Sequence, residues 1–168
     1  MTLTPRRFAN AVVLSVSGRL DQDTCDAFRT DLMVHVDAIA RDGGAIVLDL
    51  AGMEYVSSAG LRCFMLASRQ AKAQHGRIVV ASLQPMVAEI FEISHFNLVF
   101  QVFPAVREAI GAVSSDALKA FDGAWEAFDR TYAKFGLRPE VDWDALRERL
   151  RPRAGPHRHC CRSGSAPG

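Results

Sequence analysis

The stretch from Ala45 to Leu61, AIVLDLAGMEYVSSAGL, constrains the fold more than any other part of the chain. It opens with an apolar run typical of a buried strand. After Gly60 the apolar residues recur at spacings of three and four, which predicts a helix. The stretch therefore predicts a buried strand that leads through a polar loop into the first turn of a helix. Unpaired N–H groups and the helix dipole favour an anion at such a turn.

Two adjacent serines, Ser57 and Ser58, lie in this loop and allow two interpretations. Either hydroxyl can cap the helix by accepting a hydrogen bond from its first turn, a contribution of about 1 kcal/mol. Alternatively, Ser58 is a position that another protein reads or modifies. A phosphate there would be held by the amides of Ala59, Gly60 and Leu61, so it would act by placing charge in a contact surface and not by unfolding the domain.

The remainder of the chain alternates between strand and helix patterns, which indicates an α/β fold with helices packed on a small sheet. Two strands come first without a helix between them, so the sheet is expected to be mixed. The expected strands cover residues 6–17 with a break at Asn10, then 45–50, 78–81 and 98–103; the expected helices run from Asp23 or Thr24 to Arg41, and over 59–74, 86–93 and 104–113.

The pattern predicts one domain over residues 1–113, a helical extension over 114–153 and a disordered tail over 154–168. In the extension, residues 116–135 form an aromatic-rich amphipathic pattern, and a second helix is expected to start at Asp142 or Trp143. We expect these helices to pack on the domain or on a second copy of the chain, which would give a homodimer.

Composition excludes several function classes. The net charge of +1 argues against a nucleic-acid partner. No apolar run reaches the length of a membrane span or of a signal peptide, so we expect no membrane insertion and a cytoplasmic location.

Cys25 and Cys63 are interpreted as small buried residues. The compact run from His157 to Cys161 lacks the separated ligand pairs of a zinc site, and no phosphate-binding glycine loop occurs, so no metal or cofactor is expected.

Four segments in this order and spacing resemble the STAS domain family, specifically bacterial anti-sigma factor antagonists, over about residues 6–113. They are Tyr55–Leu61 with the serine pair, Val16–Asp21 after the early strand, Leu48–Leu50 before the loop, and Phe91–Ser94 followed by Phe96.

The resemblance implies a STAS-like fold and a partner switch without catalytic residues of its own. In such families the antagonist binds an anti-sigma factor that is also a serine kinase, which frees the sigma factor. The kinase phosphorylates a loop serine and so ends the binding, and a phosphatase restores it. Ser58 matches that serine, whereas Ser57 stands where the best-studied pattern has an aspartate and is therefore a competing acceptor. The partner-binding residues that the resemblance implies are Asp21, Asp23, Ser57, Ser58, Ala59 and Gly60, although capping of a helix explains Asp21 and Asp23 equally well. Arg62, in the first turn after Gly60, is added because it could meet a carboxylate of the partner; the alternative is that it is simply solvated.

Two other readings remain. The first is a STAS scaffold of another assembly, such as a lipid-transport complex, without phosphorylation. The second starts from about 35 residues of the extension, including Phe121, Trp125 and the segment Val141–Leu146, which resemble the helical lead-in of tail-specific (tricorn-like) peptidases. The catalytic region of such a peptidase would lie downstream, so a truncated fusion without peptidase activity is expected.

Overall fold

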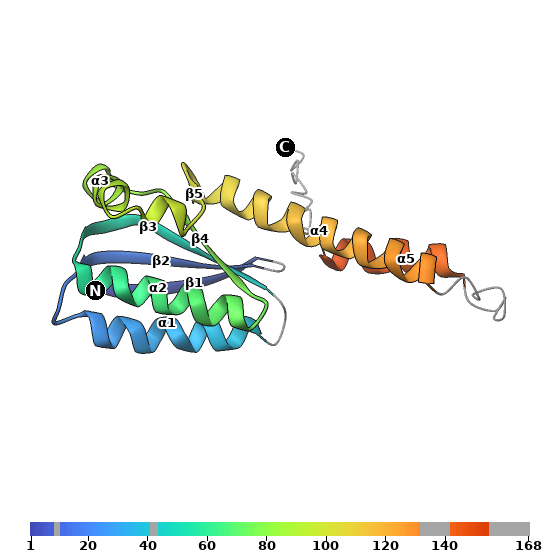
Figure 1. Ribbon diagram of the computed structural model, residues 1–168, viewed down its shortest axis with the longest axis horizontal. Helices are drawn as coiled ribbons and strands as arrows, with labels where there is room; N and C mark the ends of the chain where they lie inside the picture. Colours follow the sequence, from blue (N-terminus) through green and yellow to red (C-terminus); the bar gives the residue numbers. More distant parts are fainter. Residues whose placement is uncertain (9–10, 41–43, 132–141, 155–168) are drawn as a thin grey trace, which may run out of the picture.

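The computed structural model describes residues 1–8, 11–40, 44–131 and 142–154. They form a five-stranded sheet in the order β1-β2-β3-β4-β5, with helices on both faces (Figure 1). The elements are β1 (Thr2–Phe8), β2 (Ala11–Leu20), α1 (Cys25–Ala40), β3 (Ala45–Val56), α2 (Ser58–Ala73), β4 (Arg77–Ala81), α3 (Pro85–Ile93), the 3₁₀ turn η1 (Phe96–Leu98), β5 (Val102–Phe103), α4 (Val106–Thr131) and α5 (Trp143–Ala154).

The sheet is mixed, as expected. β1 runs antiparallel to β2, whereas the pairs β2–β3, β3–β4 and β4–β5 are parallel. Because parallel strands end at the same edge of a sheet, the connections from β2 to α1, from β3 to α2 and from β4 to α3 all lie at one end of the molecule (Figure 1). The α/β expectation is confirmed, and this end carries the serine pair.

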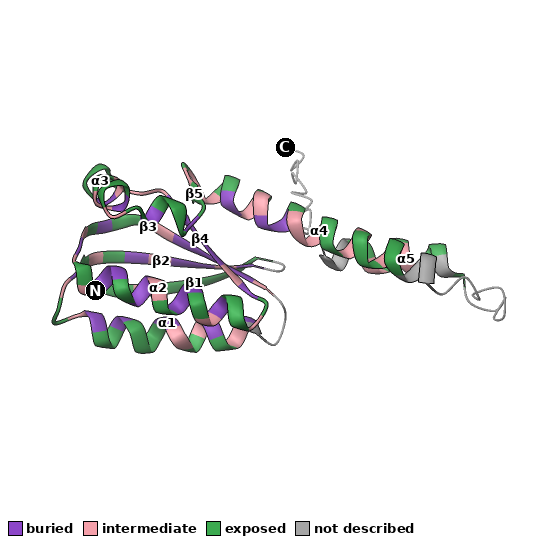
Figure 2. Cartoon of the chain, viewed as in Figure 1, coloured by how far each residue is buried: buried purple, intermediate pink, exposed green. Residues whose placement is uncertain are grey.

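The two faces of the sheet bury separate cores (Figure 2). α1, α2 and α3 cover the larger core, where Phe28, Phe64, Phe91 and Phe96 meet in successive edge-on contacts with ring centroids 5.4–6.4 Å apart. The start of α4 covers the other face. Its apolar residues pack on small and β-branched side chains of the strands, and the buried members of that core are Ala11, Val13, Ala45, Val47, Val79, Ala81, Ala109 and Val113.

The central strand is longer than the sequence pattern predicts, because β3 continues past Leu50 to Val56. Met53 and Val56 are buried, so the strand pattern resumes after the exposed Ala51 and Gly52. At Gly52 the neighbouring strand comes very close, since a Cβ there would lie 2.7 Å from the Cβ of Ser17. The expected polar loop therefore shrinks to a single residue, Ser57, between β3 and α2.

The last predicted strand, residues 98–103, is largely wrong. Only Val102 and Phe103 pair with β4, and residues 96–98 form the turn η1. Phe96 and Phe100 are both buried, with stacked rings 5.9 Å apart. A spacing of four residues places both rings on one side of a helical turn. The same spacing also places two residues on one face of a strand, so the apolar pattern alone does not distinguish the two structures.

The two helices expected on either side of residue 113 form one continuous helix, α4. Neither Gly nor Pro separates Val113 from Asp116, so nothing ends the helix there. Asp116 also pairs with Arg77 of β4, with 2.6 Å between Oδ2 and Nη1, which holds this part of α4 against the sheet edge. The expected domain boundary therefore falls inside a helix, and a division at 113 remains a prediction.

Beyond the sheet, α4 is accompanied only by α5 among the described elements (Figure 1). Asp122 of α4 accepts hydrogen bonds from Arg147 and Arg151 of α5, with a closest contact of 2.8 Å to Arg151 Nη2. As predicted, α5 starts next to Asp142, whose Oδ1 accepts a hydrogen bond from the Ala145 N–H at 2.9 Å. Residues 132–141, which include the end of the expected aromatic helix, and 155–168 of the expected tail lie outside the described residues. In the described part, no helix has the length and hydropathy needed to cross a bilayer.

Candidate functional site

Ser57 is the N-cap of α2. Its backbone is extended, with φ −86° and ψ 169°, and its Oγ accepts a hydrogen bond from the Gly60 N–H at 3.3 Å. Its own N–H donates to the carbonyl of Leu20 at 2.8 Å, which ties the start of α2 to the end of β2. The cap interpretation therefore belongs to Ser57, whose side chain is half-buried.

Ser58 is the first residue of α2 and is exposed. Its hydroxyl makes no hydrogen bond with any of the residues that the structure describes. The first intrahelical bond runs from the Leu61 N–H to the Ser57 carbonyl at 2.9 Å, so Ser58 lies at the positive end of the helix dipole. An anionic group attached to Ser58 Oγ would be stabilised at this position.

Gly60 has a packing role in this turn. It is buried, and a Cβ there would lie 2.5 Å from Leu20 Cγ and 3.0 Å from Val56 Cγ2. Glycine thus lets the first turn of α2 lie directly on the ends of β2 and β3. Gly60 itself is covered and cannot contact a partner. It contributes to a contact surface only by fixing the position of Ser58.

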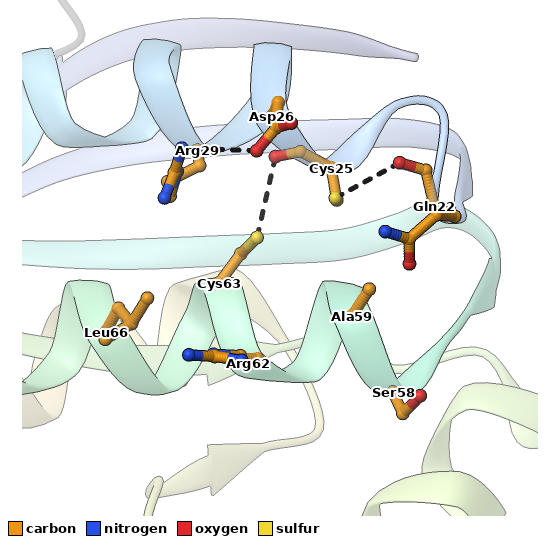
Figure 3. A pocket seen from close by; sticks show the side chains of 9 residues that line it. All are labelled: Gln22, Cys25, Asp26, Arg29, Ser58, Ala59, Arg62, Cys63 and Leu66. Atoms are coloured by element: carbon orange, nitrogen blue, oxygen red, sulfur yellow. Dashed lines mark hydrogen bonds and ion pairs between the residues drawn. The ribbon is translucent and has the colours of Figure 1, made fainter.

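Ser58 lies on the rim of an open groove between α1 and α2, with a volume of about 510 Å³ (Figure 3). Ala59, Arg62 and Leu66 of α2 form one wall, and Asp26 and Arg29 of α1 form the other. The remaining lining residues are Gln22, Cys25 and Cys63.

The two cysteines are buried at the base of this groove, as the sequence predicts. The Cys63 thiol donates to the carbonyl of Cys25 at 3.5 Å, and the Cys25 thiol donates to the carbonyl of Gln22 at 3.2 Å. Burial raises the pKa of Cys63, which keeps this thiol protonated. Both cysteines are free thiols that fill space between the helices.

Thr24 directly precedes α1, so the helix starts where the sequence predicts, and the Thr24 carbonyl accepts from the Phe28 N–H at 3.1 Å. Asp21 begins the turn in front of this helix. The carboxylate of Asp21 accepts from the Thr24 N–H at 3.2 Å, and Thr24 Oγ1 accepts in return from the Asp21 N–H at 3.0 Å. The Thr24 hydroxyl also donates to this carboxylate at 2.9 Å, which lowers the pKa of Asp21 below its ordinary value. Asp21 is therefore engaged within its own turn.

Asp23 faces a different and smaller cavity, of about 180 Å³, beside Met1 and Leu3. Of the predicted partner-binding residues, the structure thus places Ser58, Ala59 and Arg62 together on the α1–α2 groove, with Ser57 adjacent to them. It does not place Asp21 or Asp23 among the residues that line this groove.

Sequence reasoning missed the α1 side of the groove. Gln22, Asp26 and Arg29 are polar positions of an amphipathic helix, and such positions carry no signal that separates a contact surface from a solvated face. It also missed the guanidinium of Arg19, which lies 4.7 Å from the ring centroid of Tyr55 at the ends of β2 and β3. That pair lies at the ends of two inner strands, directly before the serines.

Asp49, in the middle of β3, has the hydrogen-bond partners that a half-buried carboxylate requires. Ser15 Oγ on β2 donates to Asp49 Oδ2 at 3.1 Å, and the Ala51 N–H donates to Oδ1 at 3.3 Å.

The described residues contain no group of three or more His, Cys, Asp or Glu side chains arranged to hold a metal ion. The segment from His157 to Cys161 lies outside them.

A family model described as "Mlab, STAS domain" matches residues 3–101, which include the strands β2, β3 and β4, the serine pair and the α1–α2 groove. The chain belongs to the STAS domain family. A curated relative supports this membership: BtrV of Bordetella bronchiseptica, assigned as an anti-sigma factor antagonist, is 34% identical over 118 residues, which cover 70% of this chain and 98% of BtrV.

Solved structures show the same STAS fold. A protein of Thermotoga maritima assigned as an anti-sigma factor antagonist superposes with a TM-score of 0.60 at 14% identity, covering 66% of this chain and 93% of that one. The Bacillus cell fate determinant SpoIIAA, in its phosphorylated form, superposes with a TM-score of 0.50 at 18% identity, covering 67% of this chain and 99% of SpoIIAA. These solved structures share the STAS fold with this chain.

Proposed function

We propose that this STAS protein is an anti-sigma factor antagonist that binds a serine-kinase-type anti-sigma factor, releases a sigma factor, and is switched off by phosphorylation of Ser58. The observation that carries the proposal is the division of labour between the two serines. Ser57 caps α2, whereas Ser58 presents an exposed hydroxyl on the rim of the α1–α2 groove. The assignment of BtrV as such an antagonist supports the same role here.

The chain would supply the acceptor and the partner would supply the catalysis. The kinase would transfer the γ-phosphoryl group of ATP to Ser58 Oγ, with ADP as the other product and loss of the hydroxyl proton. A serine phosphatase would return the hydroxyl by hydrolysis. The antagonist itself is not an enzyme in this scheme, and it needs no cofactor of its own.

Phosphorylation would stop binding without disturbing the fold. It adds about −1.5 to −2 charges and strong acceptor oxygens. At the start of α2 these oxygens meet the N–H groups of the first turn, so the domain tolerates them. In a contact surface the same charge must be desolvated when the partner docks, which opposes binding.

α3 and η1 expose apolar residues suited to a protein partner. Met86 and Ile93 of α3 are 58% and 73% exposed, and Leu98 of η1 is 82% exposed. A partner that covers such apolar side chains together with Ser58 would be sensitive to a charge added at Ser58. A partner that belongs to the transcription machinery also implies a cytoplasmic location.

Incubation with the cognate kinase-type anti-sigma factor and ATP tests the proposal. We expect one phosphate per chain, lost in Ser58→Ala and kept in Ser57→Ala, and the phosphorylated chain should no longer bind the kinase. Label that persists in Ser58→Ala and vanishes in Ser57→Ala would assign the acceptor to Ser57. A kinase-type anti-sigma factor that does not bind the unmodified chain would overturn the switch in favour of a STAS scaffold of another assembly.

A homodimer through the C-terminal helices is part of the proposal. Leu118, Phe121 and Trp125 on α4 and Leu146 and Leu150 on α5 are only half-buried, and the rings of Phe121 and Trp125 stack along α4. Sedimentation equilibrium should give a dimer for the full chain and a monomer for a chain that ends at Val113. A monomeric full chain would contradict this part and leave the switch at Ser58 intact.

A further inference from the structure

The groove between α1 and α2 carries an excess of positive charge near Ser58. Arg29 projects from α1 and Arg62 from α2, against a single carboxylate, Asp26. Figure 3 shows Arg29 on α1 and Arg62 on α2, the two helices that form the walls of the groove. A carboxylate bound in the groove would therefore have a guanidinium group on each wall.

The two arginines are available to a partner. Among the described residues Arg62 has no ion pair and no hydrogen bond from its side chain, although it is exposed. Arg29 has one contact, 3.2 Å from its Nη2 to Asp26 Oδ1, between side chains that are 48% and 84% exposed. An ion pair three residues apart on a helix surface contributes only a few tenths of a kcal/mol, so a better-placed carboxylate can replace it.

Apolar surface lies next to these charges. Leu66 is 36% exposed, and Ala59 and the buried thiols of Cys25 and Cys63 line the same groove. Charges held beside apolar walls are less screened by solvent than charges on an open surface. The groove thus combines an apolar base with two guanidinium donors on its rim, and guanidinium groups bind carboxylates in paired hydrogen bonds.

We propose that this groove is the docking cleft for an acidic side chain of the anti-sigma factor, held between Arg29 and Arg62. The proposal rests on the proposed function and specifies which surface the partner uses. It also explains why phosphate on Ser58 would be effective. Ser58 and Arg62 are one helical turn apart and line the same groove, so a phosphate would repel the incoming carboxylate and compete with it for Arg62.

The first test measures the affinity of the unmodified chain for its kinase-type anti-sigma factor by calorimetry at low and high salt. Arg29→Gln and Arg62→Gln should each weaken binding about tenfold. The double variant should weaken binding by less than the product of the two single effects, because both arginines hold the same carboxylate. Asp26→Asn should strengthen binding, since it frees Arg29 and removes a like charge. Arg69→Gln is the matched control, an exposed arginine of α2 outside the groove, and should bind as the parent chain does.

Losses of affinity in Arg29→Gln and Arg62→Gln that are no larger than in Arg69→Gln would overturn the docking cleft. If the parent chain still binds the anti-sigma factor in that case, the proposed function stands. A partner-free measurement keeps the cleft testable if no anti-sigma factor binds. In a titration with a tetraglutamate peptide at low salt, the side-chain Nε resonances of Arg29 and Arg62 should shift together and those of Arg69 should not. Shifts confined to other basic residues, such as Arg6 and Arg7 of β1, would overturn the cleft by themselves.

Discussion

Ser57 and Ser58 are chemically identical side chains in adjacent positions, yet the backbone gives them different environments. Ser57 lies outside the helix with an extended backbone, so its Oγ reaches back to the Gly60 N–H. Ser58 lies inside the helix, and its side chain points to solvent. A substitution at each position therefore has a distinct expected effect on stability.

Ser57→Ala should lower the free energy of unfolding by about 1 kcal/mol, because the Gly60 N–H loses its acceptor. Ser57→Asp should retain most of the parent stability, since aspartate is also a good N-cap residue. Ser58→Ala should change it by less than about 0.5 kcal/mol, as is usual for an exposed position. Urea unfolding measures all three, and an equal loss in Ser57→Ala and Ser58→Ala would contradict the assignment of the cap.

Gly60→Ala should lower the free energy of unfolding by about 1–3 kcal/mol, the usual range for overpacking a core. The added methyl would overlap Leu20, which is fully buried and has no room to move. Gly111→Ala in α4 is the matched control, because a Cβ there meets nothing within 4 Å. The control should gain up to about 1 kcal/mol from helix propensity. Thermal unfolding that shows no loss in Gly60→Ala would mean that α2 is held less closely than the structure shows.

At the level of elements, one carboxylate of α4, Asp122, forms the ion pairs to α5 that the described residues contain. Arg151 donates to Asp122 and, together with Arg147, lowers the pKa of Asp122 below its ordinary value of 3.8. A carboxyl group whose pKa is lowered in the folded state stabilises the structure above its ordinary pKa, and that contribution is lost as the pH falls through the lowered pKa. The attachment of α5 should therefore weaken below about pH 4.

Asp122→Asn should produce the same loosening at neutral pH. We expect faster amide exchange throughout α5 in this variant, with unchanged exchange in the sheet, because the ion pairs connect only the two helices. Glu126→Gln, one turn further along α4, removes the same charge without breaking any ion pair among the described residues. Equal exchange rates in the two variants would show that apolar packing, and not Asp122, attaches α5.

Most elements were predictable from sequence because their apolar patterns are local. The helix of α2 and the strand β4 appear where three-residue and four-residue spacings and a short apolar run indicate them. The break at β5 was not predictable, since Phe96 and Phe100 acquire their common core only from α3 and the sheet. The α1–α2 groove was equally hidden, because the spacing of Arg29 does not reveal that it lines the same groove as Arg62.

For the whole molecule, α4 has two separate roles. Its start covers the second face of the sheet, where Ala109 and Val113 are buried, and its later part extends away with α5 (Figure 1). A chain that ends at Val113 should therefore still unfold cooperatively. A chain that ends at Pro104 loses the buried Val113 and the partly buried Val106 and Ile110. At about 1.5–3 kcal/mol for each large aliphatic side chain when fully buried, this should cost about 3 kcal/mol from a domain total of about 5–15 kcal/mol. Calorimetry distinguishes the two, and loss of a cooperative transition at the Val113 cut would place the later part of α4 within the core.

The helix α4 also fixes how far the helical hairpin, formed by the later part of α4 (residues 114–131) and α5, lies from the STAS domain, and at which angle around the axis of α4. Residues 114–131 continue the helix for about 27 Å at 1.5 Å per residue, without a break in the helix up to Thr131. Insertion of one residue in this segment would move the hairpin by only about 1.5 Å but rotate it by about 100° around the helix axis. The number of residues in α4 therefore sets which way α5 faces relative to Ser58. A partner that contacts both Ser58 and α5 would tolerate substitutions in residues 114–131 far better than insertions or deletions.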